Sequence, residues 1–164
     1  MATALSFAPT KVADEVWIAT ALLHRERPDR LEFTIAEIVQ RARAEGLTSE
    51  QRSSFRVHVQ QHCVANRPPH TNRLRILFAT GRNTRRLFRP NDPFHPERRD
   101  GRTVPNRSDI PEMYQPLLDW YYSEYADQQG GTRTSIVDLV GLGREIWKDV
   151  DPDEYVRKLR EGWE

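Results

Sequence analysis

Arginine is concentrated in the middle of the chain, where its chemistry points to nucleic acid. Residues 52–107 hold 13 arginines and no lysine against 3 acidic residues, which is a net charge of +10. A guanidinium is a flat fork of donors that matches phosphate oxygens and the guanine edge, whereas a surface that needs only solubility would also carry lysine. The whole chain has a net charge of only +1, because residues 1–107 carry +8 and residues 108–164 carry −7. The opposite net charges of these two parts predict that each binds a different partner.

Histidine and cysteine are the other residues that invite a chemical role. His58 and His62 lie four positions apart with Cys63 adjacent, and His95 lies among acidic residues in a segment loosely like a nuclease loop. A zinc protease would need a glutamate between the two histidines, and a structural zinc site would need paired cysteines. The sequence has neither, and no phosphate-binding glycine loop. We expect no catalytic residue, no metal and no cofactor, and we interpret His62 as a hydrogen-bonded core histidine.

Three helices must position the arginines. Apolar residues recur with a helical period over residues 11–26 and 34–46. Thr34 followed by Glu37 predicts a capping box at the start of the second helix, and Gly46 is a typical stop. A third helix is expected over residues 52–65, with Phe55, Val59, His62 and Cys63 on its packed face and Arg56, Val57, Gln60 and Gln61 on its free face.

A hairpin should follow the third helix. Residues 74–79 and 86–89 have the composition of strands. Gly81 and Asn83 lie between them and tolerate the positive φ that a tight hairpin turn requires. With 164 residues, the chain favours one domain plus an appendage.

The order of helix, short strand, helix, helix and hairpin predicts an α+β winged helix-turn-helix domain over residues 11–107. Its third helix would read the major groove and its hairpin would contact phosphates. The candidate DNA-binding residues are Arg52, Arg56, Gln60, Gln61, Arg73, Arg75, Arg82, Arg85 and Arg86. The alternative is a solvated surface or a protein-binding wing, because winged helices also serve as protein modules.

The remaining segments flank this domain. Residues 1–10 are expected to be disordered, and residues 90–107, rich in proline and arginine, to form a basic extended arm or ordered loop. An amphipathic helix is expected over residues 108–127, beginning near Pro116, and would pack on the domain or pair two subunits as a homodimer. Residues 128–134 (QQGGTRT) are interpreted as a linker, and residues 135–164 as a tail.

The tail exposes large anchors on helices too short to be stable alone in water. Its anchor and cation positions are Leu142, Arg144, Ile146, Trp147, Tyr155, Val156, Arg157, Leu159, Arg160 and Trp163. Such a segment is typical of one that folds on a partner. A tail docked on its own domain is the alternative.

About 25 residues of this tail, 139–163, resemble the C-terminal tail of VapB-type antitoxins. The resemblance rests on LGREIW at 142–147 and on DPDEYVRKLREGW at 151–163. It implies that the tail wraps a PIN-domain ribonuclease toxin and places a basic side chain among the carboxylates that hold its magnesium. VapB proteins usually begin with a different DNA-binding module, so the resemblance implies little about the N-terminal part.

Taken together, the sequence predicts a type II antitoxin. The N-terminal domain would bind operator DNA and repress transcription, and the tail would neutralise a PIN-domain ribonuclease, with Arg144, Arg157 or Arg160 entering its active site. The alternative is a free-standing winged-helix transcription regulator or protein adaptor with a self-docked tail. No apolar run is long enough to span a bilayer, and we expect a cytoplasmic protein that does not contact membranes.

Overall fold

The computed structural model describes residues 9–49 and 51–128, which build a mixed α+β fold with a three-stranded antiparallel sheet. The elements in chain order are α1 (Val12–Glu26), β1 (Phe33–Thr34), α2 (Ile35–Glu45), α3 (Ser53–Val57), η1 (His58–His62), β2 (Leu77–Ala79), β3 (Thr84–Leu87), η2 (Pro96–Arg98), η3 (Arg107–Asp109), η4 (Glu112–Tyr114), α4 (Gln115–Trp120) and η5 (Tyr121–Tyr125).

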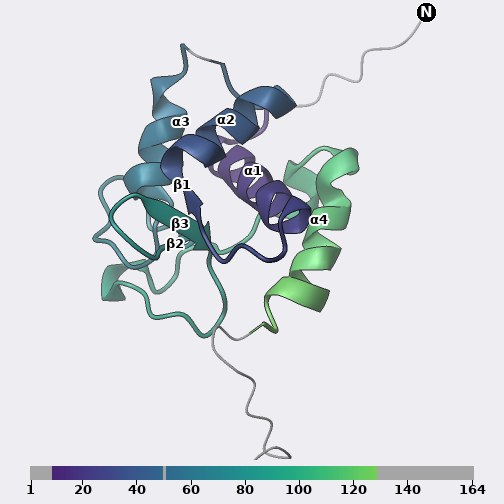
Figure 1. Ribbon diagram of the computed structural model, residues 1–164. Coiled ribbons are helices and arrows are strands. Elements are labelled where there is room, and N and C mark those ends of the chain that lie inside the picture. The colour runs from purple at the N-terminus through teal and green to yellow at the C-terminus, as the bar shows by residue number, and fades with distance from the viewer. Residues whose placement is uncertain (1–8, 50, 129–164) are drawn as a thin grey trace, which may run out of the picture. The chain divides into compact units, whose positions relative to one another are not determined.

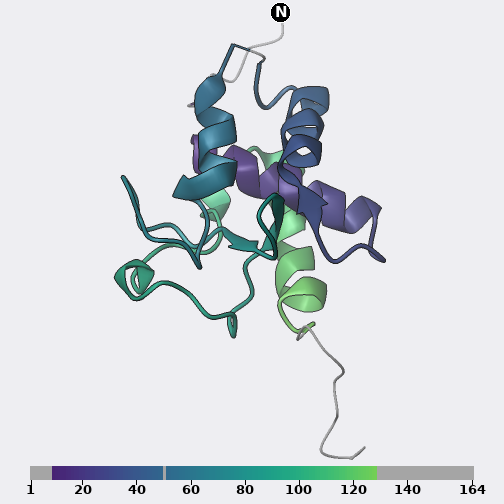
Figure 2. The same ribbon diagram turned by 60° about the vertical axis from the view of Figure 1, so that its left-hand side comes forward.

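Helix α1 is the centre of this fold. Figures 1 and 2 show it with α2 and α3 on one side and α4 on the other. Val16, Trp17, Ile18 and Ala19 are four consecutive residues with no exposed surface, so the helix is covered all round. A helix buried on every side can no longer be described by one apolar stripe. The predicted boundaries, 11–26, are nearly those observed.

Helix α2 begins and ends as the sequence predicts. The Thr34 hydroxyl accepts a hydrogen bond from the backbone N–H of Glu37 at 3.2 Å, and the Glu37 carboxylate accepts one from the backbone N–H of Thr34 at 2.8 Å. This capping box is reinforced by Arg30, whose hydrogen bonds to Glu37 lower the pKa of that carboxyl to about 2. Gly46 ends the helix in the left-handed region at φ 78°.

The sheet has the strand order β1-β3-β2, so the short strand before α2 pairs with the second strand of the hairpin. Leu77 lies opposite Leu87, and Phe33 lies opposite Arg85. The strands are shorter than the predicted runs. The expected positive φ at Gly81 and Asn83 is wrong: Gly46 alone has a positive φ among the described residues. The hairpin instead turns through a longer bend that a Thr80–Thr84 hydrogen bond closes.

The third helix is also shorter than predicted, running from Ser53 to His62 and changing from α to π geometry at His58. The physical reason lies in the hairpin. The carbonyl of Cys63 accepts hydrogen bonds from the backbone N–H groups of Ile76 and Leu77, at 3.0 and 2.8 Å. Because β2 captures this carbonyl, the chain leaves the helix there and runs beside β2, with Val64 bridged to Leu77.

The amphipathic segment after residue 107 packs on the domain, which is the first of the two predicted uses. It is a helix in three parts, and α4 has Pro116 in its first turn as expected. The predicted apolar stripe is buried: Ile110, Tyr114, Leu117, Leu118, Tyr121 and Tyr125. The Tyr121 ring meets the Trp17 ring of α1 edge-on at 6.0 Å. The apolar face that a homodimer would use is therefore already covered within one chain.

Contacts between residues group 1–128 as one unit and 129–164 as a second. Among the described residues, no helix combines the length and the apolar character that crossing a membrane requires.

Candidate nucleic-acid interface

The free face of the third helix is polar and accessible, as the sequence predicts. Arg56, Val57 and Gln61 are exposed and Gln60 is half-buried, whereas Phe55 and Val59 on the opposite face belong to the core. The two apolar side chains anchor the helix against α1 and α2. A guanidinium and two amides are thereby presented together on one surface.

Arg85 does not contact solvent, so its predicted role as a phosphate-binding residue is wrong. Its side chain is only 1% exposed and donates to the carbonyls of Val59 and Gln60, each at 3.2 Å, and to those of Gly81 and Thr84. The last carbonyls of a helix lack partners within the helix. Arg85 supplies those partners from the hairpin, so it fixes the position of the third helix relative to the hairpin.

Arg98 satisfies the same helix end from the other side. It is fully buried and donates to the carbonyls of Gln61 at 3.0 Å and His62 at 2.9 Å. Four further carbonyls lie within its reach, those of Arg67, Pro68, Asn72 and Leu74. The segment 90–107 is therefore an ordered loop that inserts a cation into the fold, and Arg98 is no part of a basic arm.

The loop that carries Arg98 passes close to the chain before β2. A Cβ atom at Gly101 would lie 1.6 Å from the carbonyl oxygen of Arg73, which leaves room only for glycine. Sequence reasoning did not find the roles of Arg85 and Arg98, because backbone carbonyls are their partners and every residue carries one.

Ion pairs neutralise three more of these arginines. Arg52 pairs with Glu15 at 3.0 Å, and Arg86 pairs with Asp92 at 2.6 Å while its guanidinium lies over the Phe78 ring. Arg102 lies 2.6 Å from the fully buried Asp14, whose burial raises the pKa of that carboxyl. Arg86 is therefore occupied within the fold and is a poor candidate for the predicted phosphate contact, and Arg52 keeps only part of its accessible charge.

Arg75 is also occupied. Its guanidinium lies 4.4 Å from the centre of the Phe94 ring, and its Nε donates to the carbonyl of Gly101 at 3.0 Å. Half-buried between aromatic rings and a backbone carbonyl, it stabilises the same loop as Arg98 and is a poor candidate for a phosphate contact.

Three of the predicted DNA-binding arginines remain uncommitted. Arg56 on the third helix, Arg73 before β2 and Arg82 at the hairpin tip are exposed and form no hydrogen bond or ion pair within residues 9–49 and 51–128. They form, with Gln60 and Gln61, the candidate interface of this domain.

Arg85 and Arg82 are three positions apart but have different roles. Their substitutions should therefore have very different effects on the free energy of unfolding. Arg85→Met should lower the free energy of unfolding by about 3 kcal/mol, because it leaves buried carbonyls without donors. Arg82→Met should change that free energy by less than about 0.5 kcal/mol, because the side chain is exposed. Urea denaturation of both variants tests this. Equal effects would contradict the assignment of Arg85 to the fold.

The histidines do not form a metal site in the part of the chain that the structure describes. The His62 ring is partly exposed, lies between the rings of His58 and His70 at 4.9 and 5.9 Å, and has no hydrogen-bond partner for Nδ1. The prediction of a hydrogen-bonded core histidine is therefore wrong. Asp92, near the loosely nuclease-like His95, caps the backbone N–H of Arg89 and pairs with Arg86, which is a structural role.

The predicted disordered start, the rest of the linker and the toxin-binding positions fall mostly outside the described residues. This applies to residues 1–8, to residues 129–134, and to all ten tail positions from Leu142 to Trp163.

Comparison with known proteins gives no match to this chain. No protein family model, no curated protein and no solved structure matches it.

Proposed function

We propose that residues 11–107 are a winged helix-turn-helix that binds duplex DNA. The proposal is supported by the order of α1, β1, α2, the third helix and the hairpin, together with the pairing of β1 with β3. In such a fold the third helix enters the major groove and the hairpin follows the phosphate backbone. Arg85 fits this use, because it ties the reading helix to the hairpin.

The observation that carries the proposal is the set of exposed cations on the third helix, at the hairpin tip and just before β2 that have no partner among the described residues. Arg56 suits the O6 and N7 acceptors of guanine, and Gln60 and Gln61 suit adenine. Arg82 at the hairpin tip and Arg73 suit phosphates. The other predicted contacts are committed within the fold, so the footprint is much smaller than the net charge of +10 over residues 52–107 implies.

This smaller footprint makes the DNA proposal quantitative. Each phosphate neutralised contributes about −0.9 to the slope of log K against log salt. With Arg73 and Arg82 contacting phosphates and Arg52 at most a third, one protomer should give a slope of about −2 to −3. A slope near zero would contradict DNA binding.

Arg56→Ala tests which element reads sequence. Binding of a fluorescent duplex from the region upstream of the chain's own gene should weaken about tenfold, because a bidentate guanine contact contributes about 1–3 kcal/mol. Binding to a random duplex should change much less. Arg25→Ala is the matched control, since Arg25 is exposed in the last turn of α1, a helix that carries none of the proposed contacts. Equal loss in both variants would refute a reading role for the third helix.

We further propose that residues 135–163 neutralise a PIN-domain ribonuclease. Support comes from the resemblance to VapB-type tails and from the acidic balance of residues 108–164, opposite to that of the body. Apolar anchors such as Leu159 and Trp163 would fill grooves of the toxin. Arg157, Arg160 or Arg144 would reach its carboxylates, where a guanidinium competes with Mg²⁺. Both proposals together describe an antitoxin that represses its own operon.

The alternative is a protein adaptor of the same fold, and one observation favours it. Much of the positive charge is neutralised internally, by Glu15, Asp14 and Asp92. A protein adaptor would bind neither the upstream duplex nor the random duplex at low salt. The DNA titrations described above therefore distinguish an adaptor from a DNA-binding protein.

A further inference from the structure

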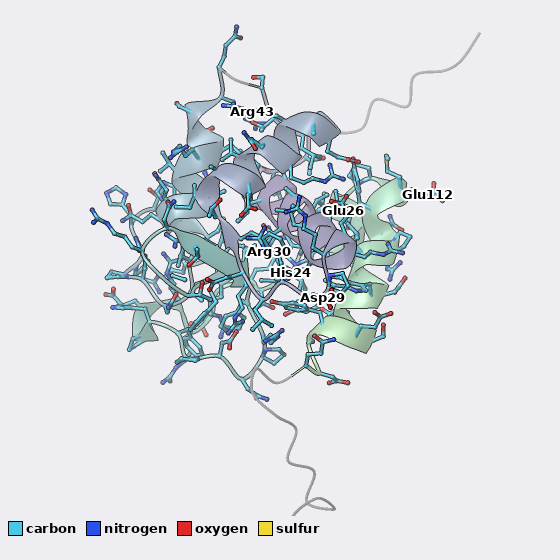
Figure 3. The ribbon with its side chains drawn as sticks, in the orientation of Figure 1. His24, Glu26, Asp29, Arg30, Arg43 and Glu112 are labelled. Carbon is cyan, nitrogen blue, oxygen red and sulfur yellow. The ribbon has the colours of Figure 1, made fainter. Side chains whose placement is uncertain are left out.

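A pocket of about 440 Å³ lies at the C-terminal end of α1, where the loop after α1 meets α4 and η5. Its walls are His24, Arg25, Pro28, Arg30, Leu31, Arg89, Pro116, Asp119, Trp120, Ser123, Glu124, Tyr125 and Gln128. Figure 3 shows His24 and Arg30 at this end of α1. The volume is within the range of small-molecule sites. None of the residues proposed to contact DNA lines it.

Arg89 is the unusual residue of this pocket. It is 7% exposed, and its Nε atom is buried without a hydrogen-bond partner. Its guanidinium lies 4.4 Å from the centre of the Tyr125 ring, and within the described residues it forms no ion pair and donates no side-chain hydrogen bond. A buried donor without an acceptor is costly, so the unpartnered Nε–H of Arg89 calls for an explanation.

The other buried cations of this domain set the contrast. Arg85 and Arg98 donate to several backbone carbonyls, and the largely buried Arg86 holds both oxygens of Asp92 at 2.6 Å. In each case the fold supplies acceptors for the guanidinium. At Arg89 it supplies an aromatic ring on one side and the pocket on the other.

His24 offers a second donor at the same place. Its Nε2 accepts the backbone N–H of Leu87 at 3.3 Å, which puts the ring proton on Nδ1. Burial, with Arg89 and Arg86 nearby, lowers the pKa of His24 to about 3, so the ring is neutral. Nδ1–H has no acceptor within the described residues. Two donors that lack acceptors thus belong to residues lining one cavity.

We propose that this pocket binds a carboxylate carried on an aromatic or apolar body. The fork of Arg89 matches the two oxygens of a carboxylate, and the Nδ1–H of His24 adds a third donor. Trp120, Tyr125 and the 71% exposed Leu31 provide the apolar walls. Asp119 and Glu124 also line the pocket, and they favour a single negative charge over the double charge of a phosphate.

A matched pair of probes tests the carboxylate. N-acetyl-tryptophan and N-acetyl-tryptophanamide differ only in that group. In ¹H–¹⁵N spectra of the full chain, N-acetyl-tryptophan should shift the Arg89 Nε–H and Trp120 indole signals saturably, and the amide should bind at least tenfold more weakly. Equal binding of the two probes, no saturable shift, or tighter binding of inorganic phosphate would overturn the proposal.

The source of the carboxylate follows from a second comparison. Tighter binding of indole-3-acetate than of N-acetyl-alanyl-tryptophan supports a free organic acid. The reverse order supports the terminus of a peptide. Both results retain the carboxylate site, and they differ in the ligand that occupies it.

Variants separate the pocket from the fold. Arg89→Met should reduce binding of N-acetyl-tryptophan at least tenfold, and Arg89→Lys should restore little of it, because an ammonium lacks the fork. Ser123→Trp obstructs the pocket from an exposed position and should abolish binding without unfolding the chain. Arg99→Met, at an exposed position outside the pocket lining, should bind like the unaltered chain. Undiminished binding in Arg89→Met or in Ser123→Trp would overturn the proposal.

Discussion

Arg98→Met should lower the free energy of unfolding by about 4 kcal/mol, the largest stability effect that we expect for a single substitution in this chain. The guanidinium is fully buried and donates to backbone carbonyls on both sides, including those of Gln61, His62 and Leu74. Methionine fills a similar volume but offers no donor. The loss of a buried charged donor costs about 3–5 kcal/mol, because its acceptors stay buried without partners.

Arg99→Met is the control for this substitution. Arg99 is the next residue and has the same side chain, but it is exposed. Its replacement should change the free energy of unfolding by less than about 0.5 kcal/mol. Urea denaturation followed by circular dichroism measures both. If Arg98→Met unfolded at the same urea concentration as Arg99→Met, the carbonyl cluster would contribute nothing to stability.

Removal of residues 135–164 should abolish neutralisation of a co-expressed PIN-domain ribonuclease and leave DNA binding within about twofold. Within the part of the chain that the structure describes, the residues of the core and of the candidate interface lie between Val12 and Tyr125, so the cut removes none of these. The proposed toxin contacts, in contrast, all lie in the removed segment. Survival of cells that carry the toxin measures neutralisation, and titration of a duplex measures DNA binding.

Two full-length variants complete this test. Arg56→Ala should weaken DNA binding but still protect cells, which is the reverse of the truncation. Leu159→Ala should weaken toxin binding by about 1–3 kcal/mol, because an aliphatic anchor at an interface contributes that much. If the truncated chain protected cells as well as the full chain, the tail would not be the toxin-binding segment.

Much of the fold could be predicted because its signals are local. The capping box of Thr34 and Glu37, the stop at Gly46 and the buried side of α2 depend on residues within a few positions of each other. The same holds for the buried stripe from Ile110 to Tyr125. The end of the third helix could not be predicted from nearby residues. It depends on hydrogen bonds from the backbone N–H groups of Ile76 and Leu77 to the carbonyl of Cys63.

The candidate interface was predicted in part. Arg56, Arg73 and Arg82 are exposed as expected and have no partner in the described ranges, but a count of positive charges could not separate them from Arg85 and Arg86. Alternation along β3 does place Arg85 on the side of Leu87, and Leu87 is buried. That pattern was the available signal for Arg85, and the charge of the side chain argued against using it.

By itself, the sequence determined which segments are helical, where the apolar core lies and that cations gather in residues 52–107. Only the tertiary structure decided which of those cations face solvent and that Arg89 lines a pocket. The physical reason is the nature of the acceptors. A guanidinium can be buried where carboxylates or backbone carbonyls from distant segments accept its hydrogen bonds. The carbonyl of Gln61, for example, is 37 residues from Arg98 in the sequence. Because every residue carries the same backbone carbonyl, the pattern of side chains in the sequence does not predict which carbonyls will accept these hydrogen bonds.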